Sequence, residues 1–123
     1  MAPHRLRNAR TGELIATAVE LADSPWKRMR GLLGRAGLDE GTGMRFEPTS
    51  SLHMMFMRFA IDVVYVDRDE RVVKLVARFK PWRFSMARGA RSAYELTVGT
   101  LEAHDVAVGD QLVLEPNGAE VPA

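Results

Sequence analysis

The chain has 123 residues, of which 46% are hydrophobic and 27% charged, and its formal net charge is +1. A chain of this length and composition forms one domain with a substantial core, which excludes collagen-like, coiled-coil and intrinsically disordered proteins. It contains no cysteine, and this excludes disulfide frameworks, thiolate zinc sites, iron–sulfur clusters and cysteine nucleophiles. We expect one domain over residues 1–123, with its core at about 12–114 and with tails at 1–11 and 116–123 that are candidates for disorder.

Charge is distributed unevenly along the chain. All 17 basic residues lie at or before Arg91, whereas the part from Ser92 onward holds acidic residues and no basic one. The two parts carry opposite charges and are expected to attract each other across the fold. The isoelectric point near 8.2 is lower than is usual for dedicated nucleic-acid binders, so nucleic acid ranks last among the partners considered.

No apolar run reaches the roughly 18 residues of a membrane span, and the basic N-terminus leads into no apolar segment of signal-peptide length. We therefore expect a soluble protein without a membrane span. It is cytoplasmic as the sequence is written, and periplasmic or exported if a leader has been removed. No sequence feature indicates a cofactor or an oligomeric state.

One amphipathic helix is expected early in the chain. Ser24 is of the type that caps helix N-termini, and Pro25 suits the first helical position. Apolar side chains then recur on one face at helical spacing, and these are Trp26, Met29, Leu32 and Leu33. Glycine at position 34 or 37 ends the pattern, which predicts a helix of about ten residues laid on a sheet.

Strands are expected along most of the remaining chain, because apolar residues alternate with polar ones or run together between turn signals. The expected strands span residues 13–21, 44–46, 52–59, 62–67, 71–79, 94–98 and 111–114. A long loop is expected at 81–91, and a second short helix or turn at 100–104. The prediction is an α+β fold: a β-rich single domain with a curled, barrel-like antiparallel or mixed sheet, one early amphipathic helix and a second short helix.

His53, Met55 and Met57 would share one face of a strand, because side chains two residues apart point the same way. An imidazole with two thioethers is a ligand set suited to Cu(I). The competing interpretation is that the methionines fill gaps in the core and that His53 is hydrogen-bonded there. No second histidine lies nearby in the sequence, so we favour core packing over a metal site.

Asp62 precedes the apolar residues 63–66 and is therefore expected at the mouth of a buried strand. A buried carboxylate must be paired or hydrogen-bonded, or its pKa rises. Such a group could act as a general base or hold an arginine in a ligand cleft. The structural alternative, which we rank slightly higher, is a carboxylate that accepts backbone amides or pairs with an arginine.

The segment Lys80-Pro81-Trp82-Arg83-Phe84 places cations beside two aromatic residues on the expected loop. Basic side chains interleaved with stacking platforms suit a phosphate, a carboxylate or a nucleobase. The alternative is a loop whose tryptophan is buried in the core while its arginines remain solvated, and we weigh the two about equally.

Several blocks of the sequence, taken in order, resemble domain of unknown function family 192. The blocks are RGLLGR at 30–35, GMRF at 43–46, HMMFMRFAIDVVYVD at 53–67, KPWR at 80–83, YEL at 94–96 with glycine at 99, and VGD at 108–110. The resemblance covers about residues 12–114 and implies a small, single, β-rich domain with one or two helices. The family commonly has proline where this chain has Ala60. It implies no established activity, and hence no catalytic residue, cofactor or partner.

The favoured hypothesis is a binding domain without catalytic function, which takes a small anionic or mixed-polarity ligand or a protein partner. Its cleft would be formed by six residues, namely His53, Met57, Asp62, Lys80, Trp82 and Arg83. One alternative is a hydrolase with Asp62 as base and His53 as acid, ranked lower because no nucleophile accompanies them. The other is a Cu(I)-binding protein that uses the histidine and methionines described above.

Overall fold

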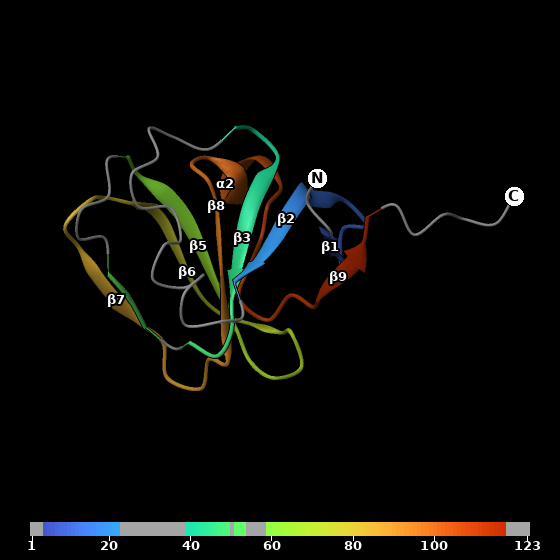
Figure 1. Cartoon of the computed structure of the whole chain (residues 1–123). Coiled ribbons are helices and arrows are strands. Elements are labelled where there is room, and N and C mark those ends of the chain that lie inside the picture. Colours follow the sequence, from blue (N-terminus) through green and yellow to red (C-terminus); the bar gives the residue numbers. More distant parts are fainter. Residues whose placement is uncertain (1–3, 23–38, 50, 54–58, 118–123) are drawn as a thin grey trace, which may run out of the picture.

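The computed structural model describes residues 4–22, 39–49, 51–53 and 59–117, and within these ranges a seven-stranded sheet stands beside a two-stranded ribbon (Figure 1). The strands of the sheet are β1 (His4–Asn8), β2 (Leu14–Ala22), β3 (Thr42–Phe46), β5 (Ile61–Val66), β6 (Val72–Phe79), β8 (Ser92–Thr97) and β9 (Leu112–Pro116). The ribbon consists of β4 (Ser51–His53) and β7 (Phe84–Met86), and the helical turn α2 spans Thr100–Ala103.

The sheet has the order β6-β5-β8-β3-β2-β1-β9, and all its neighbouring strands are antiparallel except β2 and β3, which run parallel. It curls so far that its two edges meet at one end. There a bridge joins Arg71, just before β6, to Gln111, just before β9, and the Val72 amide donates to the Asp110 carbonyl at 2.9 Å. The predicted β-rich domain with a curled mixed sheet is therefore confirmed as a half-barrel.

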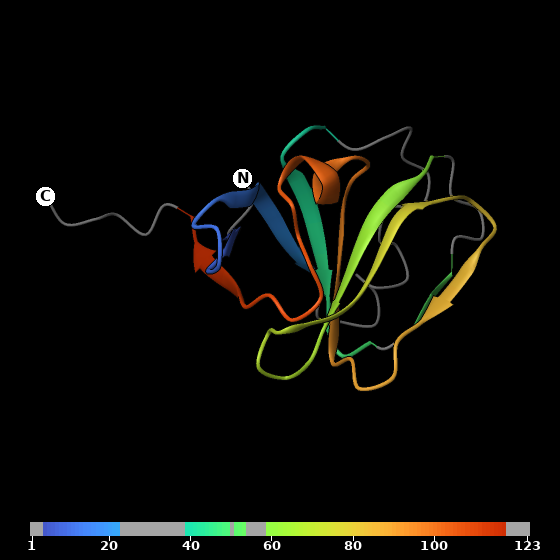
Figure 2. The same ribbon diagram turned by 180° about the vertical axis from the view of Figure 1, so that it is seen from behind.

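The sheet has a different apolar core on each face, because successive side chains of a strand point to opposite sides. The barrel interior is filled by side chains from six strands, from α2 and from the loop after α2, namely Leu6, Ile15, Ala16, Val19, Val64, Val66, Val72, Tyr94, Leu96, Leu101, Val106 and Leu112. Figure 2 shows α2 at the upper end of this interior. The outer face, on the side of the ribbon, carries a second core, namely Ala22, Met44, Phe46, Ile61, Val63, Tyr65, Phe79, Ala87 and Ala93.

Strand β5 contributes to both cores, and all six of its residues are buried. This explains why its sequence is a continuous apolar run after Asp62 rather than an alternation of apolar and polar residues. The one isoleucine, three valines and one tyrosine of β5 are residue types that favour an extended backbone. The strand lies between β6 and β8 and carries both Asp62, which faces the barrel interior, and Tyr65, which faces the ribbon.

The N-terminal stretch forms a strand, where the sequence suggested a tail. Strand β1 pairs with both β2 and β9, and its Leu6 is fully buried in the barrel interior. Arg5 and Arg7 bind Glu115 of β9, with Nε–Oε distances of 2.8 and 3.1 Å. The arginines made the segment look like a solvated tail, although they alternate with the buried leucine as a strand requires.

The loop expected at 81–91 contains β7, which pairs with β4 from Ser51↔Met86 to His53↔Phe84. The early amphipathic helix falls on residues 23–38 and lies outside the described residues, as does most of the strand expected at 52–59. The second expected helix corresponds to the four residues of α2. Among the described residues, no helix has the length and apolarity that crossing a membrane would require.

Candidate functional site

Asp62, the second residue of β5, is a carboxylate bound by the backbone. Its Oδ1 accepts a hydrogen bond from the Arg78 amide at 2.9 Å, and its Oδ2 accepts from the amides of Gly99 and Leu101, each at 3.0 Å. The side chain is only 1% exposed. Of the two interpretations that the sequence left open, the geometry supports the structural one, in which the carboxylate satisfies backbone donors.

The three bonds connect separate parts of the fold. Arg78 has a left-handed backbone, with φ 54°, and lies where the register between β5 and β6 shifts. Gly99 and Leu101 begin α2, whose own first amides have no helical acceptor. Asp62 thereby joins an irregular point of β6 to α2 and faces the barrel interior, like Val64 on the same strand.

The structure does not bring Asp62 and Trp82 together at a shared opening. Asp62 is enclosed toward the barrel interior, whereas Trp82 follows β6 on the way to the ribbon and is 63% exposed. The expected cleft also included His53 and Met57. The backbone of His53 pairs with that of Phe84, whereas Met57 lies outside the described residues, as does Met55. Within the described ranges, no group of three or more histidines or carboxylates is arranged to hold a metal ion.

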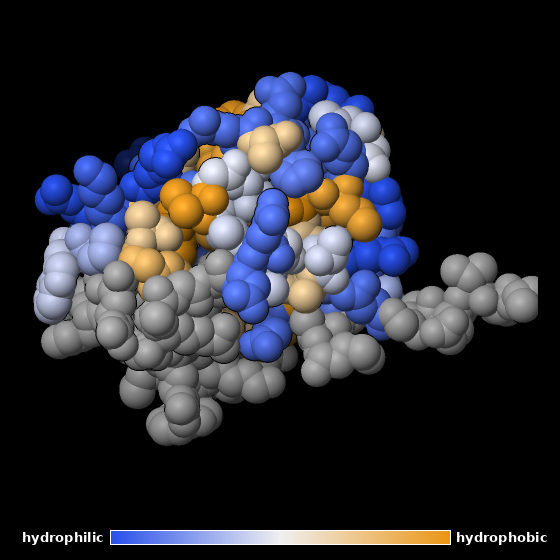
Figure 3. All heavy atoms as spheres, turned by 90° about the horizontal axis from the view of Figure 1, so that it is seen from above, coloured by the Kyte–Doolittle hydropathy of each residue, from blue (hydrophilic) through white to orange (hydrophobic). Residues whose placement is uncertain are grey.

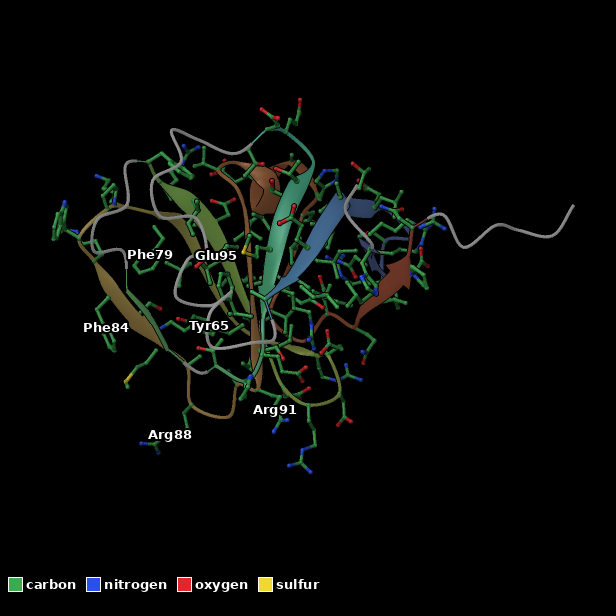
Figure 4. All side chains as sticks on the ribbon, in the orientation of Figure 1. Tyr65, Phe79, Phe84, Arg88, Arg91 and Glu95 are labelled. Atoms are coloured by element: carbon green, nitrogen blue, oxygen red, sulfur yellow. The ribbon has the colours of Figure 1, made fainter. Side chains whose placement is uncertain are left out.

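The remaining candidates, Lys80, Trp82 and Arg83, lie on an exposed surface together with Phe84, which belongs to the same sequence segment but was not part of the expected cleft, and Met86, for which the sequence predicted no role. Trp82, Phe84 and Met86 alternate along the chain and are 63%, 64% and 60% exposed. We call these three side chains the ribbon stripe. Figure 4 shows Phe84 on the outer side of β7, whereas Tyr65 and Phe79 lie between the ribbon and the sheet.

The inner side of β7 is attached to the sheet. The Tyr65 hydroxyl donates to the Ser85 carbonyl at 3.1 Å, and the Ser85 hydroxyl oxygen lies at the same distance. Ser85 and Ala87 are buried, and Lys74 of β6 donates to the Met86 carbonyl at 2.8 Å. Because these contacts hold the inner side in place, alternation turns Phe84 and Met86 outward. Two members of the stripe are thus presented on a supported strand, and the third, Trp82, lies in the turn that precedes it.

The surroundings of the ribbon stripe are cationic. Residues 80–91 include Lys80, Arg83, Arg88 and Arg91 and no acidic residue. The first three are exposed, and no ion pair is found for them within the described part of the chain. Arg88 lies below the end of β7 in Figure 4. The surface therefore combines apolar and aromatic contact area with uncompensated positive charge.

Trp82 has a left-handed backbone, with φ 66°. For a bulky L-residue this conformation costs of the order of 1–2 kcal/mol, and glycine or asparagine would adopt it more easily. The fold thus keeps an exposed aromatic residue at a position where it is locally unfavourable. Backbone strain of this kind clusters at functional sites, which makes Trp82 a candidate for a role in recognition.

Glu95 of β8 is a second buried carboxylate of interest, and the sequence analysis assigned it no role. It is 6% exposed, and burial raises its pKa to about 8. No hydrogen bond to its carboxylate is found within the described ranges. The signal in the sequence was a single acidic residue inside the otherwise apolar stretch Ala93-Tyr94-Glu95-Leu96, which would place a carboxyl group on a covered face of the sheet.

The end of the sheet opposite α2 carries a cluster of charges that are already paired. Arg45 binds Glu47 and Glu70 at 3.0 and 2.7 Å, and its Nε donates to the Tyr94 hydroxyl at 3.0 Å. The face seen from above, toward α2, is also largely hydrophilic, with apolar spheres in separate small groups (Figure 3). Neither region presents a continuous apolar surface like the ribbon stripe.

Comparison with known proteins places the chain in a family. Residues 6–114 match the model of DUF192, described as an uncharacterized ACR. A UPF0127 protein of Pyrococcus furiosus is 37% identical over 109 residues, which cover 85% of this chain and 93% of the relative. A UPF0127 protein of Thermococcus sibiricus is 31% identical over 112 residues, or 87% of this chain and 72% of the relative.

Two solved structures share the fold. One is a protein of unknown function from Novosphingobium aromaticivorans, with a TM-score of 0.77, 22% identity, and coverage of 90% of this chain and 83% of that chain. The other is a Sinorhizobium meliloti protein for which a role in transcription regulation has been suggested, with a TM-score of 0.79, 23% identity, and coverage of 93% and 96%. At this identity the likeness establishes the fold alone. The match over residues 6–114, with relatives 31% and 37% identical, shows that the chain belongs to the DUF192 family.

Proposed function

We propose that this protein is a binding domain whose ribbon stripe, with the surrounding cations, takes an acidic, amphipathic peptide segment of a partner protein. The observation that carries the proposal is the exposure of Phe84 and Met86 on β7, whose inner side is fixed to the sheet, together with that of Trp82 in the turn just before it, each at least 60% exposed. Large apolar side chains exposed singly are common on proteins, but several exposed within five residues, two of them aromatic, are typical of interaction sites.

The charges support the choice of partner. Lys80, Arg83 and Arg88 border the stripe, and residues 80–91 include no acidic residue. A peptide that alternates acidic and apolar residues would place apolar side chains against the stripe and carboxylates near the cations. The same cations would repel a basic peptide, so the surface selects partners by charge as well as by apolar contact.

The hydrolase alternative depends on Asp62 reaching a substrate. Both oxygens of its carboxylate accept amide hydrogen bonds, and the group is 1% exposed. A general base must approach the proton that it removes to hydrogen-bond distance. Since the geometry leaves Asp62 no such approach, we assign it a structural role.

The proposal is tested by the fluorescence anisotropy of a labelled peptide in which glutamate and leucine alternate. Wild-type protein is expected to bind it, and binding should weaken as salt is added because part of the attraction is between charges. Trp82→Asn should lower the affinity at least tenfold, since buried tryptophan side chains dominate many interfaces. Asparagine tolerates the left-handed backbone of this position, so the variant is expected to fold.

The matched control is Val108→Asn. Val108 is also 63% exposed but lies in the turn before β9, away from the ribbon, so its replacement should leave the affinity unchanged. A peptide with lysine in place of glutamate and a labelled DNA oligonucleotide complete the experiment. Failure to bind the acidic peptide, equal binding of the lysine peptide, or equal losses in both variants would contradict the proposal. Binding of the oligonucleotide alone would favour nucleic acid instead.

A further inference from the structure

Lys74 of β6 places a positive charge at the border of the ribbon stripe. Its Nζ donates a hydrogen bond to the Met86 carbonyl at 2.8 Å, so the ammonium group is held beside a residue whose side chain is 60% exposed. Lys74 is itself exposed, and no ion pair is found for it within the described part of the chain. An ammonium group has three hydrogens to donate, of which this bond uses one. Two donors and a positive charge are therefore available to a bound molecule at the Met86 end of the stripe.

Arg88 adds a second cation at this end. It follows Met86 by two residues, is exposed, and lies below the end of β7 in Figure 4. The residue between them, Ala87, is buried in the outer core and holds the backbone at this point. Lys74 and Arg88 thus come from two different segments and supply positive charge at the same end of the stripe.

The opposite end of the stripe has cations of its own. Lys80 lies two residues before Trp82 and Arg83 directly after it, and both cations are exposed. Residues 71–91 include no acidic residue, so this part of the chain offers nothing that would neutralise the charge at either end. Positive charge therefore stands at both ends of the apolar surface.

The length of the stripe limits the segment that it can take. At about 3.3 Å per residue, the chain from Trp82 to Met86 spans at most about 13 Å, which is the length of about five extended residues of a partner. A carboxylate beyond either end of such a segment reaches the cations. A carboxylate at its centre would instead lie over Phe84, where it would lose water against an aromatic ring whose face carries negative partial charge.

We propose that the ribbon stripe takes a short segment with an apolar centre and acidic residues at both ends, and that Lys74, with Arg88, binds the carboxylates at the Met86 end. This inference rests on the proposed function and adds the order of the residues in the partner to their composition. Lys74 is then a residue that determines specificity, because it distinguishes a carboxylate at this end from a neutral or basic group. Its bond to the Met86 carbonyl orders the ammonium group before the partner arrives, which lowers the entropy lost on binding.

The order of residues is tested with two labelled peptides of the same composition, compared by fluorescence anisotropy. One has glutamates at both ends of a centre in which leucine and serine alternate, and the other has its glutamates in the centre and its leucines at the ends. Wild-type protein should bind the first peptide about fivefold more tightly. Equal affinities would overturn the proposed order and leave the proposed function in place. Failure to bind these two peptides and the alternating glutamate–leucine peptide would overturn both proposals.

The role of Lys74 is tested by removing and by reversing its charge. Lys74→Gln should weaken binding of the first peptide about threefold, as expected for the loss of one exposed ion pair, because the amide keeps a donor for the Met86 carbonyl but carries no charge. Lys74→Glu should weaken it about tenfold, because repulsion replaces attraction. Arg68→Glu is the matched control with the same change in net charge. Arg68 is exposed in the turn between β5 and β6, away from the ribbon (Figures 1 and 2), and its replacement should leave the affinity unchanged.

A charge exchange separates this role from a structural one, since Lys74 also helps to hold β7. Two further peptides have lysines in place of the glutamates at one end, the N-terminal end in one peptide and the C-terminal end in the other. Lys74→Glu should prefer one of these two peptides to the original, whereas wild-type protein should prefer the original to both. The preferred peptide also gives the direction in which the segment lies. If Lys74→Glu weakens the binding of every peptide by the same factor, as a loosened ribbon would, or if Arg68→Glu weakens it as much, the assignment of Lys74 is overturned.

Discussion

The Tyr65 hydroxyl on β5 donates a hydrogen bond to the Ser85 carbonyl on β7 at 3.1 Å and so attaches the ribbon to the central sheet. Tyr65 is fully buried, and its ring belongs to the outer core together with Ala87. One side chain thus supplies both apolar contact and a polar anchor for a strand of three residues. The orientation of the ribbon stripe depends on this attachment, because β7 alone is too short to be stable as a strand.

Tyr65→Phe should loosen the ribbon while preserving the outer core. The variant removes the hydroxyl and leaves the Ser85 carbonyl without this donor, which should lower the free energy of unfolding by about 1–2 kcal/mol. The acidic peptide should bind more weakly, because part of its binding free energy would be spent on ordering the strand. Urea unfolding and peptide anisotropy measure the two effects. Ser85→Ala, which keeps the carbonyl acceptor, should change both less, and an equal effect would contradict this account.

Asp62→Asn should destabilise the protein without a specific effect on the ribbon stripe. The amide can accept with one atom only, so at least one of the amides of Arg78, Gly99 and Leu101 loses its acceptor in a buried position. We expect the free energy of unfolding to fall by about 2–3 kcal/mol. The exposed Asp69→Asn should stay within about 0.5 kcal/mol of wild type. A stable Asp62 variant that has lost peptide binding would return this residue to the binding site.

The parts of the fold that follow from strong local patterns were predictable. Strands β2, β5, β6 and β8 coincide with alternating or continuous apolar runs, and the half-barrel follows from many short strands with short connections. Strand β1 was missed because its arginines were taken for a solvated tail, although Glu115, more than 100 residues away, neutralises them. A contact of that range has no local signature.

The candidate site was predictable only in part, for the same reason. The sequence singled out Lys80, Trp82 and Arg83 from their composition, but the presence of β7 depends on pairing with β4 and on Tyr65. Without that pairing, the outward direction of Phe84 and Met86 could not be derived. Glu95 shows the converse case. Its burial was readable from the apolar neighbours, but which described groups lie near its carboxyl group is a property of the assembled face.

Asp110 should contribute to the loss of stability, measured as the free energy of unfolding, at acidic pH. Its hydrogen bond with Arg10 lowers its pKa from 3.8 to about 2, so the unfolded chain binds more protons than the folded one between these values. The stabilisation is complete above about pH 4 and is lost as the pH falls toward 2. Asp110→Asn should remove this slope and lower the free energy of unfolding at pH 7 by about 2 kcal/mol. Urea unfolding between pH 2 and pH 5 measures it. An unchanged slope in the variant would assign it to other carboxylates.

Glu95 should lower the free energy of unfolding as the pH rises, which is the opposite of the effect of Asp110. Its pKa is about 8 in the folded protein and 4.5 ordinarily, so between these values the folded state holds the additional proton. The free energy of unfolding is therefore expected to fall as the pH rises from 4.5 to 8 and to level off above, since each unit of pKa difference is worth about 1.4 kcal/mol. Glu95→Gln, which cannot ionise, should remove this decline and be more stable than wild type at pH 8. Equal pH slopes for the two proteins would mean that burial does not keep this carboxyl group protonated in the folded protein.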